Sequence, residues 1–300
     1  MKPALQRAIS VTSDYMFWDN LRFLRMGRMD PTLKLTRTRL QMARWFKQGP
    51  ATLELSINST QIIASAWGDA AEEALERTPH LLGLHDTPVL DFGHPRLNKM
   101  LKPVINLRLS KSPFLSHALP SHILQQQIAW RDAARIWRNL CEKHGQDAPG
   151  PASLKLPLSF DQLRRLPHHS YQSAGLIENR IPLMREIGRL GHRIDQWYAT
   201  SIETYARNIQ TLPQMGPWTT FHALAVSMGE PDVVVTGDYT LPHTVSWALK
   251  RQARSTDQEM IKLLKPYKGN RWRLVRLLWA LNIAAPRRGA RMSAAHTRRR

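Results

Sequence analysis

The stretch Thr211–Leu249, TLPQMGPWTTFHALAVSMGEPDVVVTGDYTLPHTVSWAL, decides the fold of this chain. It opens with a tight hairpin, LPQMG, which separates the end of one helix from the start of the next. The pattern predicts a helix over Pro217–Met228, then an apolar run at Val233–Val235 and a further helix that begins at Gly237-Asp238.

Each part of this stretch suits a site for the phosphate backbone of DNA. Pro217 fits the first turn of a helix, and Gly216 has no side chain to keep a phosphate away. The first N–H groups of the helix have no partner within it and attract an anion. Such a hairpin grips one strand without reading its sequence. The LPxxGP pattern also occurs in ordinary helix–helix turns, so the pattern alone leaves both interpretations open.

The charge balance indicates the same partner. The 300 residues contain 43 Lys and Arg against 23 Asp and Glu, a formal net charge of +20, and the pI is about 10.9. A protein this basic is attracted to polyanions, with nucleic acid considered ahead of anionic membrane surfaces. An excess of Arg that only serves solubility is the alternative.

Cysteine content and hydropathy exclude several classes of protein. The single cysteine, Cys141, excludes an intrachain disulfide framework, a four-cysteine iron–sulfur cluster and a zinc ribbon. No secretory signal is visible, and no segment approaches the ~20 apolar residues of a membrane span. We expect a cytoplasmic monomer without membrane contact, associated with the nucleoid if its source is bacterial.

Strand signals fill the first third of the chain. Apolar and polar residues alternate over 53–57 and again over 62–66, and the intervening 58–60 predicts the turn of a hairpin. Further strands are predicted within 33–42, and a helix at 70–76. Together these elements predict a small antiparallel sheet with helices on one face.

A helical pattern begins near Ser116. The stretch 122–143 carries one broad apolar stripe with basic residues mostly on the other side, and GQDAPGP at 145–151 predicts a linker. We therefore expect an α+β chain with three parts: a strand-rich accessory domain (1–115), a helical core (116–285) and a basic tail (286–300).

Two capping boxes punctuate the helical core. Ser159 with Gln162 predicts the start of a short helix, and Thr200 with Glu203 predicts a helix that ends near Thr211. In such a box each side chain bonds the backbone N–H of the other residue.

The motifs resemble those of a known superfamily. LPQMGPWTT followed by VVVTGDY resembles the signature of the helix-hairpin-helix DNA glycosylases: a hairpin of LPGxG type, a Thr on the next helix and a downstream Asp. Flanking stretches resemble the DNA-3-methyladenine glycosylase II group, namely ILQQQI, LPHHSYQSAGLIENR, KPYKGNRWRLVRLLW, PATLELS, SAWG and ALERTPHLLGL. The resemblance spans nearly the whole chain and implies an antiparallel-sheet accessory domain before an all-α glycosylase core.

Asp238 is the catalytic residue that this resemblance implies, because members use the matching Asp to assist cleavage of the N-glycosidic bond. A carboxylate at a helix start accepts backbone N–H bonds and stays ionised. It then stabilises the positive charge that grows on deoxyribose as the base departs, and can orient or deprotonate the attacking water. In the alternative interpretation Asp238 is only a helix cap.

The resemblance also implies a base pocket and a DNA wedge. Trp218 and His222 share one face of the helix after the hairpin, where an indole ring suits a cationic base. Trp279 matches a further aromatic residue of the pocket. Gln126 and Gln127 lie beside the wedge that fills the space of a flipped base. Core packing of the tryptophans and an ordinary polar helix face are the alternatives.

Four residues of the hairpin region are implied to bind DNA: Leu212, Gln214, Gly216 and Thr219. Gln214 departs from the family, which usually has the first glycine of the hairpin there. If this position needs a positive φ, Gln costs about 1 kcal/mol and reshapes the turn. The departure argues against a tight grip on DNA and against the monovalent cation that relatives bind at this hairpin.

Trp218 also occupies the position where lyase-competent members carry their Schiff-base lysine, so the resemblance implies a monofunctional hydrolase. We expect it to flip and remove alkylated bases such as 3-methyladenine from double-stranded DNA, with no organic cofactor and no metal. Two rival functions stay open. One is a non-catalytic DNA-binding helix-hairpin-helix protein, and the other is a related glycosylase for neutral, oxidised or deaminated bases.

Overall fold

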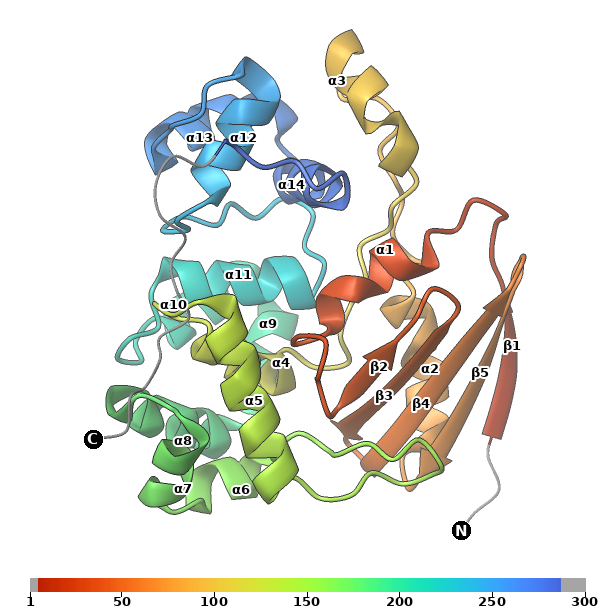
Figure 1. Ribbon diagram of the computed structural model, residues 1–300, viewed down its shortest axis with the longest axis vertical. Coiled ribbons are helices and arrows are strands. Elements are labelled where there is room, and N and C mark those ends of the chain that lie inside the picture. The colour runs from red at the N-terminus through yellow and green to blue at the C-terminus, as the bar shows by residue number, and fades with distance from the viewer. Residues whose placement is uncertain (1–4, 287–300) are drawn as a thin grey trace.

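The computed structural model describes residues 5–286, and its N-terminal part forms one antiparallel sheet in the order β1-β5-β4-β3-β2 (Figure 1). The strands are β1 (Leu5–Ser10), β2 (Leu33–Leu35), β3 (Arg39–Phe46), β4 (Gly49–Asn58) and β5 (Gln61–Gly68). The predicted hairpin is confirmed, with Leu55 opposite Ala64 and Ile57 opposite Ile62. Ser59 turns the chain with a φ of 53°.

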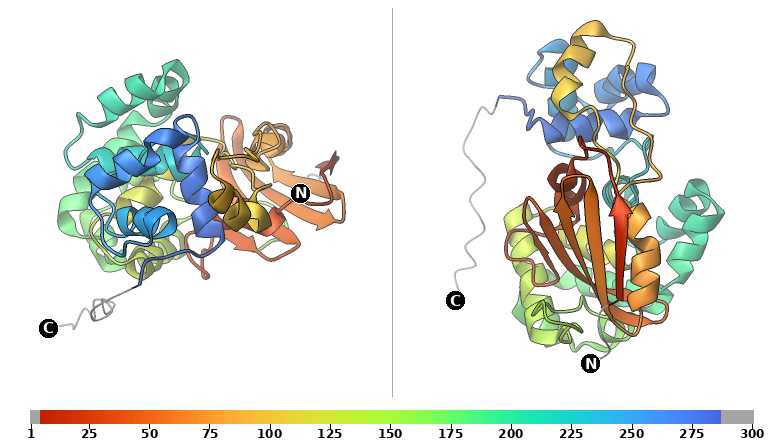
Figure 2. Two further views of the ribbon diagram at one scale, coloured as in Figure 1. Left: turned by 90° about the horizontal axis from the view of Figure 1, so that it is seen from above. Right: turned by 90° about the vertical axis from the view of Figure 1, so that its right-hand side faces the viewer.

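Alternation of side chains along the strands gives the sheet one apolar face. Leu53, Leu55, Ile62 and Ala64 are all buried, and they pack with α1 (Phe17–Leu21) and α2 (Ala71–Leu81). Helix α2 crosses β1, β4 and β5, and Figure 2 shows it lying against the sheet. The helix predicted at 70–76 is thus the first half of α2.

The remainder of the described chain is mainly helical, which makes the fold α+β as predicted. The helices are α3 (Pro95–Leu101), α4 (Leu115–Leu124), α5 (Trp130–His144), α6 (Phe160–Arg165), α7 (His168–Ala174), α8 (Ile181–Leu190), α9 (Arg193–Thr200), α10 (Ile202–Ile209), α11 (Pro217–Ser227), α12 (Leu241–Lys250), α13 (Asp257–Leu264) and α14 (Arg271–Ala280). Short 3-10 turns lie at 22–24, 102–104, 178–180 and 265–267.

Two large apolar clusters divide the interior. One lies between the sheet, α1 and α2, and the other joins α4, α5 and the helices that follow. Phe92, Leu97, Leu107 and Leu109 pack in the helical cluster although they precede the predicted domain boundary at residue 115. This segment therefore packs with the helical part before the predicted boundary is reached. The position of the domain boundary stays a prediction.

The structure corrects two predictions about helices. The stripe at 122–143 is broken: α4 ends at Leu124, α5 begins at Trp130, and Gln127 between them has a φ of 60°. Thr200 ends α9, and its hydroxyl donates to the carbonyl of Gln196 over 3.1 Å. Ser201 therefore caps α10 instead, accepting from the backbone N–H of Thr204 over 3.0 Å.

The predicted capping box at Ser159 is confirmed. The predicted linker at 145–151 leads into a segment that packs against the sheet. Both halves of the Ser159–Gln162 box are formed at the start of α6. The chain after 145–151 turns back so that Asp147 bridges Lys155, and Leu154 and Leu156 pack against Ala43 of β3. The segment is held against the sheet because these leucines need cover from water.

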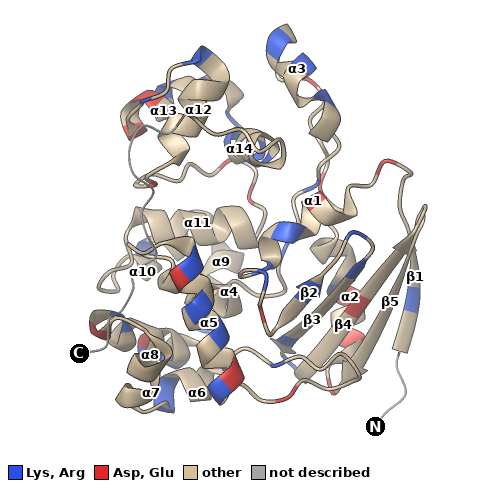
Figure 3. Cartoon of the chain, viewed as in Figure 1, with Lys and Arg blue, Asp and Glu red and all other residues tan. Residues whose placement is uncertain are grey.

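Basic residues are spread over both parts of the molecule, with Lys and Arg prominent on α3 and α5 (Figure 3). Within residues 5–286, no helix combines the length and the apolar character that crossing a bilayer requires. The predicted basic tail lies outside the described residues from 287 onward.

Candidate active site

The Asp238 carboxylate is fixed at the start of α12. Gly237 turns the chain with a φ of 80°, and its N–H donates to Oδ2 of Asp257 over 2.8 Å. Oδ1 of Asp238 accepts from the backbone N–H groups of Thr240 and Leu241, each over 2.8 Å, and from the Thr240 hydroxyl over 3.1 Å. The predicted bonds from backbone N–H groups are formed, and they hold the carboxylate in one orientation. The predicted helix start at Gly237-Asp238 is wrong, because α12 begins at Leu241 and its N-cap is Thr240.

The second carboxylate oxygen is bound from α11. The indole Nε1–H of Trp218 donates to Oδ2 of Asp238 over 3.0 Å. Burial raises the pKa of Asp238, but the hydrogen bonds from Trp218, Thr240 and Leu241 outweigh it, so the pKa lies below its ordinary value. Asp238 is thus ionised at neutral pH.

A chain of buried polar groups supports the Trp218 ring. His222 stacks on Trp218 with ring centroids 4.6 Å apart and planes inclined by 16°. Nδ1 of His222 lies 3.1 Å from Nδ1 of His122, and Nε2 of His122 lies 2.7 Å from the Ser227 hydroxyl. The predicted shared face of Trp218 and His222 is confirmed.

Both histidines of this chain are neutral at physiological pH. Burial lowers the pKa of His222 to about 4, although the charge of Asp238 opposes the shift. Burial also lowers the pKa of His122 well below its ordinary value, with a further contribution from His222. Two facing Nδ1 atoms cannot both carry a proton, so one ring donates to the other. A neutral His222 is a weak general acid.

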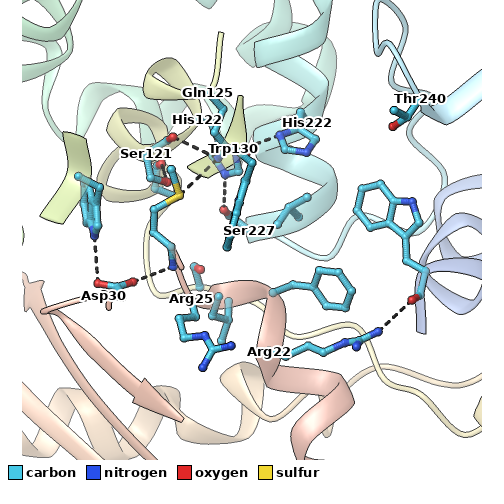
Figure 4. A pocket seen from close by; sticks show the side chains of 18 of the residues that line it. Arg22, Arg25, Asp30, Ser121, His122, Gln125, Trp130, His222, Ser227 and Thr240 are labelled. Atoms are coloured by element: carbon cyan, nitrogen blue, oxygen red, sulfur yellow. Dashed lines mark hydrogen bonds between the residues drawn. The ribbon is translucent and has the colours of Figure 1, made fainter. Parts of the chain in front are cut away.

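A cavity of about 1460 Å³ opens beside this cluster, between α4, α11, α12 and the segment that contains α1 (Figure 4). His222 lines it, as do Tyr239 and Thr240. Asp238, the residue before them, lies next to the cavity but is not among the residues that line it. Trp279 lines it as well, stacked on Phe23 with ring centroids 5.8 Å apart. The cavity is large enough and aromatic enough to receive a flipped base.

Trp218 is placed differently from the prediction. It is not among the residues that line the cavity, and one of its faces is covered by His222. Its indole N–H is committed to Asp238. Trp218 therefore positions the carboxylate, and the aromatic wall of the cavity comes from other residues, such as Phe23 and Trp279.

The hairpin joins α10 to α11 as predicted. Gln214 has a φ of 69°, so the position does require the left-handed conformation that glycine adopts freely. Gly216 is exposed, and a Cβ atom there would meet nothing within 4 Å. The N-terminus of α11 is thus open to an anion. Leu212 is half-buried against the helical core, so its side chain anchors the hairpin.

Gln126 and Thr219 were both predicted to contact DNA, but their side chains face inward. Gln126 is 8% exposed, and its Nε2 donates to the Thr219 hydroxyl over 2.7 Å and to the carbonyl of Gln214 over 3.0 Å. Thr219 is 2% exposed. The side chains of Gln126 and Thr219 hold the hairpin in place, whereas Gln127 is exposed at the tip of its turn.

Sequence reasoning missed the contribution of the N-terminal segment to the cavity. Arg22, Phe23 and Arg25 line it, and Arg22 donates to the carbonyl of Trp279 over 2.9 Å. Trp130, which is 51% exposed, also lines it. The signal was present in FWDNLRFLRMGR at 17–28, where aromatic and basic residues alternate as in nucleic-acid binding segments.

Among residues 5–286, no three His, Cys, Asp or Glu side chains gather as a metal ion would require.

Several solved structures with the same fold are DNA glycosylases. No family model and no curated protein matches the sequence. A 3-methyladenine DNA glycosylase from Archaeoglobus fulgidus superimposes with a TM-score of 0.79 at 15% identity, over 92% of this chain and 97% of that one. An 8-oxoguanine glycosylase/lyase from Clostridium acetobutylicum, bound to double-stranded DNA, gives a TM-score of 0.66 at 12% identity, over 92% and 97%.

A shorter relative aligns with less of the chain. A 3-methyladenine DNA glycosylase from Schizosaccharomyces pombe, in complex with abasic DNA, gives a TM-score of 0.52 at 15% identity, over 69% of this chain and 98% of that one. This chain therefore has the fold of the DNA glycosylases that the motifs resemble. At these identities the likeness establishes the fold and leaves the substrate open.

Proposed function

We propose that this protein is a base-excision repair glycosylase, which hydrolyses the N-glycosidic bond of a damaged base flipped out of double-stranded DNA. The observation that carries the proposal is the ionised Asp238 carboxylate, held by Trp218 and by the start of α12 beside an aromatic cavity. The exposed Gly216 at the N-terminus of α11 supplies a seat for a backbone phosphate.

In the proposed reaction the flipped base enters the cavity and stacks on its aromatic wall. As the glycosidic bond breaks, its electron pair leaves with the base, and positive charge develops on the sugar. Asp238 stabilises this charge and accepts a proton from the attacking water, whose oxygen bonds the anomeric carbon. The products are a free base and an abasic site.

We further propose that the enzyme has no lyase activity. A lyase needs an amine that attacks the sugar and forms an imine. By resemblance Trp218 stands in the place of that amine, and none of the described residues that line the cavity is a lysine. Borohydride should therefore trap no covalent adduct between protein and DNA, and the abasic strand should break only after alkali.

Alkylated bases are the first proposed substrate. A base alkylated at a ring nitrogen carries positive charge and departs as a neutral species, so it needs no proton from the enzyme. This suits a site whose histidine is neutral, since burial lowers the pKa of His222 to about 4. Tyr239 and Trp130 line the cavity with exposed rings, so they offer a cation the stacking surface that Trp218 does not.

A neutral base is the second candidate, and the charge of the cavity favours it. Four arginines line the cavity, against one aspartate. Positive side chains repel a cationic base and offer donors to the carbonyl groups of oxidised or deaminated bases. The arginines are Arg22, Arg25, Arg44 and Arg254, and the aspartate is Asp30.

A lesion panel separates these candidates. Matched duplexes carry 3-methyladenine, 7-methylguanine, hypoxanthine or 8-oxoguanine, and released base is measured by chromatography under single-turnover conditions. Fastest release of the methylated purines supports the first candidate, and fastest release of hypoxanthine or 8-oxoguanine supports the second. Release of no base at any enzyme concentration contradicts the proposed function and leaves a non-catalytic DNA-binding protein.

A further inference from the structure

Two turns that face the same side of the helical core both contain a glutamine in the left-handed conformation. The glutamine turn (125–129) has Gln127 at a φ of 60°, and the hairpin turn (210–216) has Gln214 at a φ of 69°. Residues other than glycine adopt the left-handed backbone conformation at a cost of about 1–2 kcal/mol each. Something in the surroundings must hold both turns in shape.

Arg180 contacts both of these glutamines. It lies just before α8 and is 7% exposed. Its Nη1 donates to Oε1 of Gln214, and its Nη2 donates to Oε1 of Gln127 over 3.1 Å. One planar guanidinium thus spans two turns that are 87 positions apart in the sequence.

Gln126 ties the same turns a second time, by its bonds to the carbonyl of Gln214 and the hydroxyl of Thr219. Both oxygens that Arg180 holds belong to neutral amides, so its desolvation is not balanced by a carboxylate there. Burial accordingly lowers the pKa of Arg180. This is a costly way to stabilise a fold, but it leaves a positive charge directly beneath two turns.

We propose that Arg180 is a positioning residue that locks the hairpin turn and the glutamine turn at a fixed separation, so that both engage damaged DNA as one unit. The inference rests on the proposed function, in which the hairpin turn holds the backbone, and on the expectation from the sequence that Gln127 lies beside the wedge that fills the space of the flipped base. Flipping costs a few kcal/mol. If both turns are already held in place, the free energy of binding is available for flipping the base and is not spent on ordering the turns.

The Gln214→Gly variant gives opposite results under the two interpretations. Glycine removes the backbone strain and also removes the amide that Arg180 holds. If Gln214 is merely a strained departure from glycine, the variant should bind DNA as well as the wild type or better. If the lock exists, preference for a duplex with a tetrahydrofuran abasic-site analogue over an undamaged duplex should fall about tenfold, the size of one lost charge-assisted hydrogen bond.

Arg180→Met and the double variant complete the test. Arg180→Met keeps the length of the side chain, removes its hydrogen bonds and leaves no buried charge. We expect it to lower the abasic-site preference as Gln214→Gly does, and the double variant to lose no more than either single variant. Additive losses, or an unchanged preference in Gln214→Gly, would overturn the proposal.

Arg185→Met, within the helix that follows Arg180, is the matched control. Arg185 donates to the carbonyl of Leu166 over 3.0 Å, away from both turns, so its loss should leave the abasic-site preference unchanged. Urea unfolding of each variant shows whether it is folded. The free energies of unfolding of the wild type, Arg180→Met, Gln214→Gly and the double variant also measure the Arg180–Gln214 contact in the absence of DNA. Coupled losses without base release by the wild type would support the lock and contradict the proposed function.

Discussion

The indole N–H of Trp218 donates to Oδ2 of Asp238 over 3.0 Å, and this bond joins the helix after the hairpin to the turn that leads into α12. The bond is made from α11 to the start of α12, 20 positions along the chain. It changes the role of Trp218, because a side chain expected to stack on the base instead holds the carboxylate that we propose stabilises the sugar cation.

Replacing Trp218 by phenylalanine isolates this bond. Trp218→Phe keeps an aromatic ring against His222 but removes the N–H, so the ionised form of Asp238 loses a donor and its pKa rises. We expect the single-turnover excision rate to fall about fivefold to tenfold at neutral pH. In the pH profile of this rate, the fall on the acid side should begin at a higher pH than in the wild type, because Asp238 is protonated at a higher pH.

Trp272→Phe is the control for that measurement. Trp272 is 1% exposed in the helical core, and its Nε1 has no hydrogen-bond partner among the described residues. Its replacement should leave the acid limb where it is in the wild type. An equal shift of the limb in both variants would mean that the Trp218 bond does not control the ionisation of Asp238.

The neutral histidine pair predicts how stability depends on pH. The ordinary pKa of His222 is 6.5, whereas burial lowers it to about 4 in the folded protein. Between these values the unfolded chain binds more protons, so lowering the pH reduces the free energy of unfolding, by about 3 kcal/mol at most for His222. His122 adds to the same trend.

Urea unfolding between pH 7.5 and 4.5 checks this trend. The wild type should lose stability as the pH falls from 6.5 toward 4, and His222→Phe should show a flatter dependence over the same range. The two curves would run parallel if His222 took up its proton at the same pH in the folded and the unfolded protein, which would contradict the lowered pKa assigned to it.

DNA affinity should depend steeply on salt, given the formal net charge of +20. The logarithm of the binding constant should fall with the logarithm of salt concentration, with a slope of about −0.9 per neutralised phosphate. A chain that ends at Pro286 should give a shallower slope if the basic tail contacts DNA. Identical slopes for the full and shortened chains would show that the tail takes no part.

Local patterns allowed several elements to be predicted from the sequence. The hairpin at LPQMG, the helix start at Pro217 and the capping box at Ser159 depend on residues within a few positions of each other. The same holds for the β-hairpin around Ser59. Each is specified by short-range hydrogen bonds or by the conformations that Gly and Pro favour, so a single stretch of chain contains the whole signal.

The contacts that build the site could not be predicted in this way. Arg180 bonds glutamines 34 and 53 positions away, and Phe23 meets Trp279 from the other end of the chain. Such pairs arise from packing and leave no periodic pattern. The break at Gln127 also lacked a signal, because QQQIAW contains neither Gly nor Pro.

Excision by Asp238→Asn tests the central claim most directly. Asparagine keeps nearly the same shape and an oxygen for the N–H groups of Thr240 and Leu241, but it has no negative charge. The base that the wild type releases fastest is presented in a duplex, and single-turnover release and DNA affinity are measured for both proteins. We predict that the release rate of the variant is lower than that of the wild type by a factor of about 100 or more. Its affinity for DNA should stay equal or rise. Release at a near-normal rate by Asp238→Asn would contradict the account.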